Sequence, residues 1–348
     1  MEVRDVSPEI PLRPPRLFLP TTNGRGRGGG MNNVMWSSKL EADYLGNLTL
    51  EPAHSRGISS LKFHPNGTCL CSAGADGFIF LWNHVNGGRE RQLLGHQLGV
   101  DEVQWSNDGR FLASASDDRT VKIWDVEKGV CIRTMRGHEI SAFSCAWNVQ
   151  GNMIASGGAD GMVIYWDTRT GTFIRTVACH TSYPVTSLEF HKDSHILLSA
   201  STDGLCRIWE VATGHCLKTL VEQSNPMVGS ARFSPNGRYI LVSHVNSSIK
   251  LWDYLRTKEK RAFQGHENEK YCIPASFLCG GRSGEPVSVV SGSEDGKLYV
   301  WDVNTRKVLK TLEYHKDVCC ATACHPFQRI IASGGLEKDR SIRIWNNL

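Results

Sequence analysis

The chain has 348 residues, 40% of them hydrophobic, and 39 lysines and arginines nearly balance 35 acidic residues, for a formal charge of +4. This balance argues against a domain that coats DNA. The sequence has neither an 18-residue apolar run nor the pattern of a signal peptide, so we expect a soluble, intracellular protein with no membrane contact.

Residues 1–40 differ in composition from the rest. They hold five of the thirteen prolines and a run, Gly24 to Gly30, in which two arginines alternate with glycines. We predict a disordered tail over 1–40 and a folded domain over 41–348. The glycine-arginine run lacks the Lys-Ser/Thr of a phosphate loop. Contact with RNA, methylation and a plain flexible tail are the alternatives, and two arginines alone favour the last.

Seven tryptophans divide the remaining chain into similar units. They follow one another at intervals of 42 to 49 residues and are Trp82, Trp124, Trp166, Trp209, Trp252, Trp301 and Trp345. A short acid or amide stands six residues before each of them, and six units also carry an upstream histidine. A period in the forties with Trp-Asp endings is typical of WD repeats. We therefore predict an all-β, seven-bladed WD40 β-propeller.

Residues 95–137 illustrate one unit. Strands are predicted at 100–105, 111–116, 121–124 and 130–134, with turns between them. One four-stranded sheet cannot bury both of its faces, but sheets stacked around an axis can.

Within a unit such as residues 95–137, a buried hydrogen-bonded set is expected. The histidine should bridge the turn aspartate and a serine, and the serine should accept the indole N–H. The predicted members are His54, Asp76, Trp82, His96, Ser114, Asp118, Trp124, His138, Asp160, Trp166, His180, Asp203, Trp209, His266, Asp295 and Trp301. A hydrolase needs its nucleophile once, so a trio that recurs in unit after unit indicates a structural role. No G-x-S-x-G elbow is present.

Three units need separate treatment. The last repeat stops three residues after Trp345, so we predict that residues 44–51 supply its fourth strand and close the ring. In the fifth unit Asn246 replaces the turn aspartate and Gly-His is missing, so packing alone is expected to hold it. The sixth unit is longer, and residues 280–286 are predicted to form a surface loop.

The twelve cysteines are scattered and form no C-x2-C pair, so reduced, buried thiols are expected. We predict no metal, no cofactor and no enzymatic activity. The residues before the turn acids should ring one mouth of the propeller: Ala75, Asp117, Ala159, Thr202, Val245, Glu294 and Lys338. A partly apolar mouth with one or two carboxylates suits an arginine side chain. The alternative is that these are solvated turn residues.

Five stretches resemble the WD-repeat protein five family, the propeller subunit of COMPASS and trithorax-type histone H3 lysine methyltransferase complexes. They are residues 203–209, 233–241, 268–273, 291–295 and 322–326. The resemblance covers about residues 44–348. It implies a non-catalytic scaffold, monomeric within a hetero-complex, that bridges protein subunits of a chromatin-modifying complex without binding DNA directly. The implied location is the nucleus, with the cytoplasm left open.

In that family, one mouth holds an arginine of a partner motif or of the histone H3 tail between two phenylalanines. Phe143 matches the first, and Pro274 stands where the second is expected. The resemblance implies further mouth residues: Ser59, Ala75, Gly99, Asp101, Asp117, Tyr271 and Cys272. The positions that depart from the family are Gly57, Asp101, Thr186, Thr202 and Gly229. Losing one aromatic face removes about 0.5–2 kcal/mol of cation–π energy, which the added charge of Asp101 could offset.

The resemblance also implies a second groove, on the opposite face, for an acidic-aliphatic segment of another subunit. Its residues are Asn236, Tyr239, Leu251 and Phe277, with Cys279 in place of a valine; ordinary strand packing is the alternative. A different function stays open too. Segments such as His64 to Gly67 would also suit a propeller adaptor in a spliceosomal ribonucleoprotein or a ubiquitin ligase.

Overall fold

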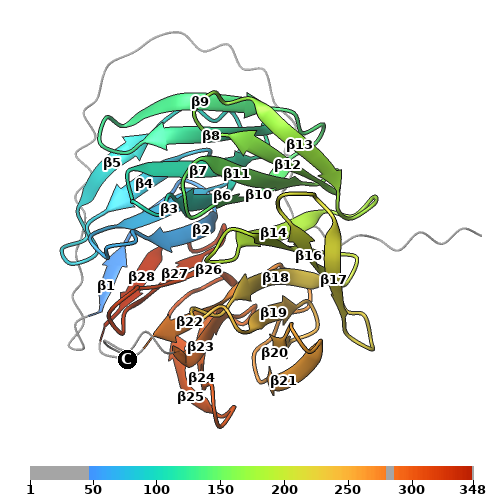
Figure 1. The fold of residues 1–348 in the computed structure, drawn as a ribbon. Helices are drawn as coiled ribbons and strands as arrows, with labels where there is room; N and C mark the ends of the chain where they lie inside the picture. The colour runs from blue at the N-terminus through green and yellow to red at the C-terminus, as the bar shows by residue number, and fades with distance from the viewer. Residues whose placement is uncertain (1–46, 280–285, 347–348) are drawn as a thin grey trace, which may run out of the picture.

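A computed structural model of the chain describes residues 47–279 and 286–346. These residues form seven four-stranded antiparallel sheets arranged around one axis (Figure 1). The predicted all-β, seven-bladed propeller is confirmed. The described ranges contain no helix and therefore no helix that is long and apolar enough to cross a membrane. The predicted tail over 1–40 and most of the loop over 280–286 lie outside the described residues.

The strands follow the chain blade by blade. Blade one has β2 (Ile58–Phe63), β3 (Leu70–Gly74), β4 (Ile79–Trp82) and β5 (Arg89–Leu93). Blade two has β6 (Val100–Trp105), β7 (Phe111–Ser116), β8 (Thr120–Asp125) and β9 (Val130–Arg136). Blade three has β10 (Ala142–Trp147), β11 (Met153–Gly158), β12 (Met162–Asp167) and β13 (Phe173–Ala178). Blade four has β14 (Val185–Phe190), β15 (Ile196–Ser201), β16 (Leu205–Glu210) and β17 (Cys216–Val221).

The remaining three blades complete the ring. Blade five has β18 (Val228–Phe233), β19 (Ile240–His244), β20 (Ser248–Asp253) and β21 (Lys258–Phe263). Blade six has β22 (Ala275–Cys279), β23 (Pro286–Gly292), β24 (Lys297–Asp302) and β25 (Val308–Glu313). Blade seven has β26 (Cys319–Cys324), β27 (Ile331–Gly335), β28 (Ile342–Trp345) and, as its outermost strand, β1 (Leu48–Leu50).

Burial decreases from the axis to the rim of the ring. All of β10 is buried, whereas β13 of the same blade is mostly exposed. The core lies between adjacent blades. Leu93 of blade one, for example, packs in one cluster with Val103 and Trp124 of blade two. Each sheet thus buries its apolar faces only because it has neighbours on both sides.

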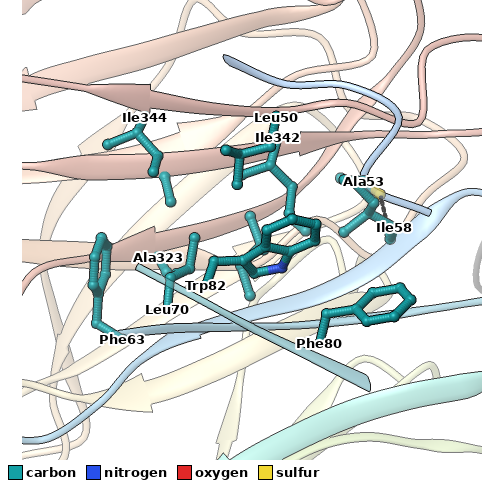
Figure 2. Packing of buried hydrophobic residues seen from close by; sticks show 14 of the residues in the cluster. Leu50, Ala53, Ile58, Phe63, Leu70, Phe80, Trp82, Ala323, Ile342 and Ile344 are labelled. Carbon is teal, nitrogen blue, oxygen red and sulfur yellow. Dashed lines mark hydrogen bonds between the residues drawn. The ribbon is translucent and has the colours of Figure 1, made fainter. Parts of the chain in front are cut away.

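The two ends of the chain meet in blade seven, as predicted. In the register of β1 with β28, Leu48 pairs with Ile344 and Leu50 pairs with Ile342. Figure 2 shows Leu50, Ile342 and Ile344 in the same cluster as Trp82 of blade one. Residues 44–46 of the predicted strand lie outside the described residues. The closing strand therefore joins blade seven through both backbone pairing and the apolar core.

One irregularity recurs in the inner strands. In six of the seven blades the register shifts at the second residue of the innermost strand, which leaves one bulged residue there. These residues are Ser59, Asp101, Phe143, Thr186, Gly229 and Cys320. A β-bulge re-aims a side chain and often lies beside a functional site.

Candidate functional site

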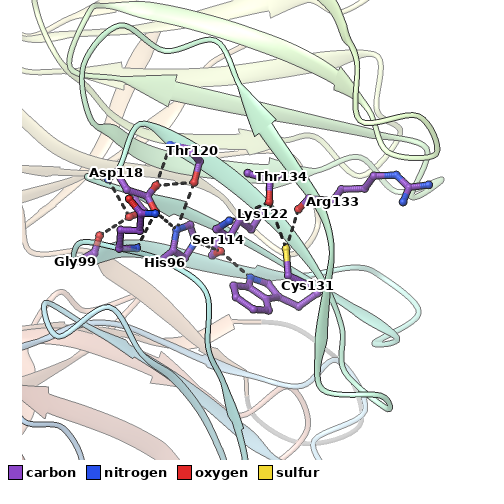
Figure 3. A network of polar contacts seen from close by, with 12 residues as sticks. His96, Gly99, Ser114, Asp118, Thr120, Lys122, Cys131, Arg133 and Thr134 are labelled. Atoms are coloured by element: carbon purple, nitrogen blue, oxygen red, sulfur yellow. Dashed lines mark hydrogen bonds and ion pairs between the residues drawn. The ribbon is translucent and has the colours of Figure 1, made fainter.

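The hydrogen-bonded set of blade two has the expected geometry (Figure 3). His96 Nδ1 lies 2.8 Å from Asp118 Oδ2, and Nε2 lies 2.6 Å from Ser114 Oγ. Trp124 Nε1 donates to the same Ser114 Oγ over 2.8 Å. Because Ser114 accepts the indole N–H, its hydroxyl can donate to Nε2, which places the histidine proton on Nδ1, facing the aspartate.

The same set recurs in blades one, three and four, with serines at 72, 156 and 199. Ser72, Ser114, Ser156 and Ser199 are all 0% exposed. A substrate cannot reach a fully buried hydroxyl. The geometry therefore gives these Ser-His-Asp trios a structural role.

Burial and hydrogen bonding oppose each other in these sets. Burial lowers the pKa of His96 despite the nearby Asp118. Burial alone would raise the pKa of Asp118, but hydrogen bonds from His96 and Thr120 outweigh it and hold that pKa well below its usual value. The pair is thus a neutral imidazole beside a carboxylate at neutral pH.

Blade seven also has a complete set, although its residues are not among the predicted members. His315 lies 2.5 Å from Asp339 and 2.7 Å from Ser333, and Trp345 donates to Ser333 over 2.8 Å. Ser333 stands twelve residues before its tryptophan, whereas the serines of the other sets stand ten before theirs. A search with one fixed spacing misses it.

Blade six corrects the prediction. Within residues 47–279 and 286–346, the ring nitrogens of His266 have no hydrogen-bond partner, and Asp295 instead accepts the Tyr299 hydroxyl over 2.9 Å. Trp301 Nε1 donates to the carbonyl of Gln264 over 2.9 Å. His266, Asp295 and Trp301 therefore do not form the expected set, and burial lowers the pKa of His266 to about 4.

Blade five is held by more than packing, contrary to the expectation. Glu222 lies 2.8 Å from Lys250 Nζ and 3.4 Å from His244 Nε2, and Glu259 lies 2.9 Å from the same ammonium. Burial lowers the pKa of His244 to about 4 despite the attraction of Glu222. A cross-strand ion cluster thus replaces the histidine-serine set.

The mouth residues share one backbone bond. In five blades the amide of the predicted residue donates to the carbonyl just before the inner strand, as Asp117 does to Gly99 over 3.0 Å. The five are Ala75, Asp117, Ala159, Thr202 and Val245, whereas Glu294 donates to the carbonyl of Glu267, eight residues before β22. In blade seven this bond is made by Leu336, to Val318, over 3.1 Å. Lys338 does not occupy the equivalent position, because the turn of blade seven is wider.

The bulged residues next to the mouth form part of a collar between blades. Ser59 donates to the Val100 carbonyl of the next blade, Thr186 donates to Val228 over 3.0 Å, and Cys320 donates to Ile58 over 2.9 Å. Cys320 was missed, although it stands five residues after His315, as Ser59 stands after His54.

The other three bulges carry different side chains: Asp101, 5% exposed, Phe143, 7% exposed, and Gly229. A Cβ at Gly229 would lie 3.0 Å from the Cα of Cys272. The close approach of that loop leaves little room for a side chain at this position. A carboxylate, an aromatic ring and a glycine thus occupy these three bulges.

A polar cavity of about 40 Å³ lies at the centre of the ring. Ser59, Asp101, Cys272 and Pro274 line it together with Lys62, Glu102 and Arg232 of the inner strands. Four of the predicted mouth residues therefore converge on one space. Ala75, Gly99 and Asp117 lie beside it on the loops: a Cβ at Gly99 would be 3.2 Å from Ala75 Cα and 3.4 Å from Asp117 Oδ2.

Below the mouth, opposite charges from several blades meet. Lys62 Nζ lies 3.2 Å and Arg232 Nη2 lies 3.9 Å from the same oxygen of Glu102. Burial lowers the pKa of Lys62, and burial raises the pKa of Glu189, which accepts the Phe233 amide over 2.6 Å. The inner strands therefore bring charged side chains of both signs together around this small cavity.

Glu294 has a different role from the one predicted. Its Oε1 accepts the amides of Glu269, Lys270 and Tyr271 over 2.8, 2.6 and 3.0 Å. The carboxylate thus folds the long loop of blade six. Tyr271 is half-buried, and burial and the nearby acids Asp317 and Glu294 raise the pKa of its hydroxyl.

Three of the four predicted groove residues lie together between blades five and six. Tyr239 and Phe277 are half-buried and pack against the cluster that contains Leu251, which is only 3% exposed. Asn236 lies in the preceding turn, where its Oδ1 accepts Ser234 Oγ over 2.7 Å. Leu251 therefore supports the core, and the accessible edges belong to the two aromatic residues.

A larger pocket, of about 790 Å³, lies where the closing strand meets blade one. Leu50, Pro52, Phe78, Phe80 and Arg89 are among its lining residues. Arg89 lies over the Phe80 ring at 5.0 Å. This pocket could not be predicted from the repeat pattern, because residues of blade one and of blade seven with its closing strand build it together.

The ring of seven sheets, with its tryptophan-centred hydrogen bonds, defines a WD-repeat β-propeller. Such propellers generally act as non-catalytic scaffolds that bind other proteins. Residues 49–346 match the WDR5 beta-propeller domain, and the chain belongs to this family.

Individual relatives match over about two repeats. Human DDB1- and CUL4-associated factor 6 is 34% identical over 89 residues, 26% of this chain and 10% of that protein. Human pre-mRNA-processing factor 17 is 30% identical over 94 residues, 26% of this chain and 15% of that protein. The mouse U5 small nuclear ribonucleoprotein 40 kDa protein is 35% identical over 86 residues, 22% of this chain and 24% of that protein. The chain thus spans at most about a quarter of each.

Proposed function

We propose that the chain is a scaffold that binds an arginine-containing peptide at the mouth and bridges subunits of a COMPASS-like histone H3 lysine methyltransferase complex in the nucleus. The observation that supports the proposal is that the neighbouring blades two and three carry candidate arginine-binding side chains at equivalent positions. Asp101 and Phe143 occupy equivalent bulges of neighbouring inner strands, and Asp117 lies on the adjoining turn. The match of residues 49–346 to the WDR5 propeller supports it.

The chemistry of the opening suits a guanidinium group. Asp101 and Asp117 supply two carboxylates, and charge-assisted hydrogen bonds from arginine to carboxylate are among the strongest. Phe143 offers an aromatic ring for a cation–π contact of about 0.5–2 kcal/mol. Pro274 lines the cavity and offers no aromatic face. We expect electrostatics to contribute more here than stacking does.

Calorimetry with an H3 N-terminal peptide tests the mouth. The unmodified peptide should bind, and its arginine-to-glutamine counterpart should bind at least about tenfold more weakly. Asp117→Ala and Phe143→Ala should each weaken binding without unfolding the domain, whereas Glu139→Ala, which changes an exposed acid outside the cavity, should leave the affinity unchanged. Unchanged affinity in both mouth variants would place the binding site elsewhere.

The complex itself requires a second experiment. Affinity purification of the full chain followed by mass spectrometry should recover histone methyltransferase subunits, with the Asp117→Ala variant as the matched control. Their absence from the eluate counts against this function.

A second candidate is a propeller adaptor in a spliceosomal ribonucleoprotein or in a ubiquitin ligase. The relatives named for pre-mRNA processing, for the U5 ribonucleoprotein and for association with DDB1 and CUL4 favour it. The same purification separates the candidates, because it would then recover components of those assemblies instead.

We also infer that the edge formed by Tyr239 and Phe277 takes an acidic-aliphatic segment of a second subunit, with Asn236 as a hydrogen-bonding neighbour. Both rings are half-buried and lie in one cluster. A double Tyr239→Ala, Phe277→Ala variant should no longer bind that subunit but should still bind the arginine peptide. If the variant binds both, the second subunit does not bind at this edge.

A further inference from the structure

The mouth has an apolar side and a charged side. The two sides differ in the residues that occupy one equivalent position of the repeats. In six blades, one residue directly precedes the carbonyl that accepts the mouth amide. In chain order these residues are Arg56, Leu98, Ile140, Tyr183, Pro226 and Asp317. The middle four are apolar or aromatic and come from four consecutive blades, whereas the two charged residues come from blades one and seven.

The apolar members are open to solvent. Leu98 is 55% exposed, Ile140 is 51% exposed and Tyr183 is 36% exposed, and Pro226 is half-buried. Their loops lead into β6, β10, β14 and β18, which are neighbours in the ring. We name Leu98, Ile140, Tyr183 and Pro226 the apolar arc. Exposed apolar residues gathered on one side of a binding site mark an interaction surface more often than single scattered ones do.

The opposite sector is already occupied by polar interactions. Arg56 Nη2 lies 2.9 Å from Glu337, and Asp317 accepts the amides of Val318 and Lys338, each over 2.9 Å. Lys316, Lys338 and Arg340 are exposed around this part of the opening. A partner that crosses the mouth therefore meets aliphatic and aromatic surface on one side and cationic groups on the other.

We propose that the apolar arc selects the flanking residues of the peptide: an extended segment whose arginine enters the mouth, with bulky aliphatic residues on one side of it and acidic residues on the other. This inference rests on the proposed function, because the arc adjoins the mouth directly. It goes further by making the arc, rather than the cavity alone, a determinant of specificity.

Three synthetic peptides test the arc. The probes are Leu-Leu-Leu-Gly-Arg-Gly-Glu-Glu-Glu, the same residues in reverse order, and Ser-Ser-Ser-Gly-Arg-Gly-Ser-Ser-Ser. We expect at least one leucine peptide to bind about tenfold more tightly than the serine peptide, which corresponds to about 1.4 kcal/mol. The triple variant Leu98→Ser, Ile140→Ser, Tyr183→Ser should abolish that gain and leave the serine peptide unaffected.

The chain offers a matched control in Phe327, which is 61% exposed on the loop between β26 and β27, away from the arc. Phe327→Ser should keep the full gain. Because all substituted residues are exposed, thermal unfolding should be unchanged in every variant. A gain that survives the triple variant, or the absence of any gain in either leucine peptide, overturns the proposal.

Failure of the arginine mouth gives a different pattern. The serine peptide would then bind no better than its glutamine counterpart, and Asp117→Ala would change nothing. The arc is then judged on the leucine peptides with glutamine in place of arginine. Binding that the triple variant removes supports the arc without the mouth, and binding that is absent or insensitive to the variant refutes the arc as well.

Discussion

Blades two and six contain the same four residue types, histidine, serine, turn aspartate and tryptophan, but only blade two joins them by hydrogen bonds. His96 stands four residues before β6, whereas His266 stands nine residues before β22. The longer loop leaves the His266 ring against Trp301, with 5.4 Å between ring centroids, and away from Asp295.

A side chain that competes with the histidine for the turn aspartate is the second difference between blades two and six. Two residues before the tryptophan, blade two has Lys122, which donates to Thr134 over 2.9 Å, and blade six has Tyr299. The Tyr299 hydroxyl binds Asp295 where the histidine would bind. A repeat motif therefore fixes which residues are present, while loop length and one neighbour decide whether they interact.

The largest effect should come from replacing each histidine by phenylalanine. His96→Phe removes a partner from Asp118 and from the fully buried Ser114, so the free energy of unfolding should fall by about 2–4 kcal/mol. His266→Phe removes no hydrogen bond and keeps a ring against Trp301, so the change should stay within about 1 kcal/mol. Urea denaturation at pH 7 measures both. Equal losses would show that the hydrogen bonds are not what distinguishes the blades.

The free energy of unfolding should depend on pH differently in His266→Phe and in the parent chain. Burial lowers the pKa of His266 to about 4, below the unfolded value near 6.5. Because the unfolded chain then binds the proton more readily, this contribution to stability is complete above about pH 6.5 and is lost as the pH falls toward 4.

Between pH 7.5 and pH 4.5 the parent chain should therefore lose about 2–3 kcal/mol more than His266→Phe. Denaturation curves at matched pH values give the difference. Parallel losses in the two proteins would mean that His266 titrates in the folded state as it does in the unfolded one.

Replacing each tryptophan by phenylalanine should give a smaller contrast. Both indoles are 0% exposed, so the packing loss should be similar. Trp124→Phe also deprives the buried Ser114 of a donor, whereas Trp301→Phe frees the carbonyl of Gln264, an exposed residue that water can reach. We expect Trp124→Phe to be worse by about 1 kcal/mol in chemical denaturation. The reverse order would contradict the assignment of the buried serine as the decisive partner.

The sequence predicted what depends on repetition. The period of the tryptophans and turn acids was sufficient for seven blades, and the alternation around Thr49 was sufficient for the closing strand. The prediction failed where a contact depends on the length and direction of particular side chains. The Tyr299 hydroxyl and the ion cluster around Glu222 are examples, because the spacing of their residues has no counterpart in the other repeats. Equivalent positions across blades would have indicated Cys320, but a search for family residues alone did not.

Tyr299→Phe should have the smallest effect on stability. It tests directly why His266 and Asp295 do not form a hydrogen bond. It removes one hydrogen bond to Asp295, so the free energy of unfolding should fall by about 1 kcal/mol or less. Tyr165→Phe is the matched control, since the buried Tyr165 hydroxyl has no hydrogen-bond partner in the described part of the chain and no loss is expected. If Tyr299 is what keeps Asp295 from His266, the freed carboxylate should attract the imidazole, and NMR titration should show the pKa of His266 rising from about 4. If that pKa stays low, the long loop alone holds the ring away, and shortening it would be needed to give blade six the hydrogen bonds of blade two.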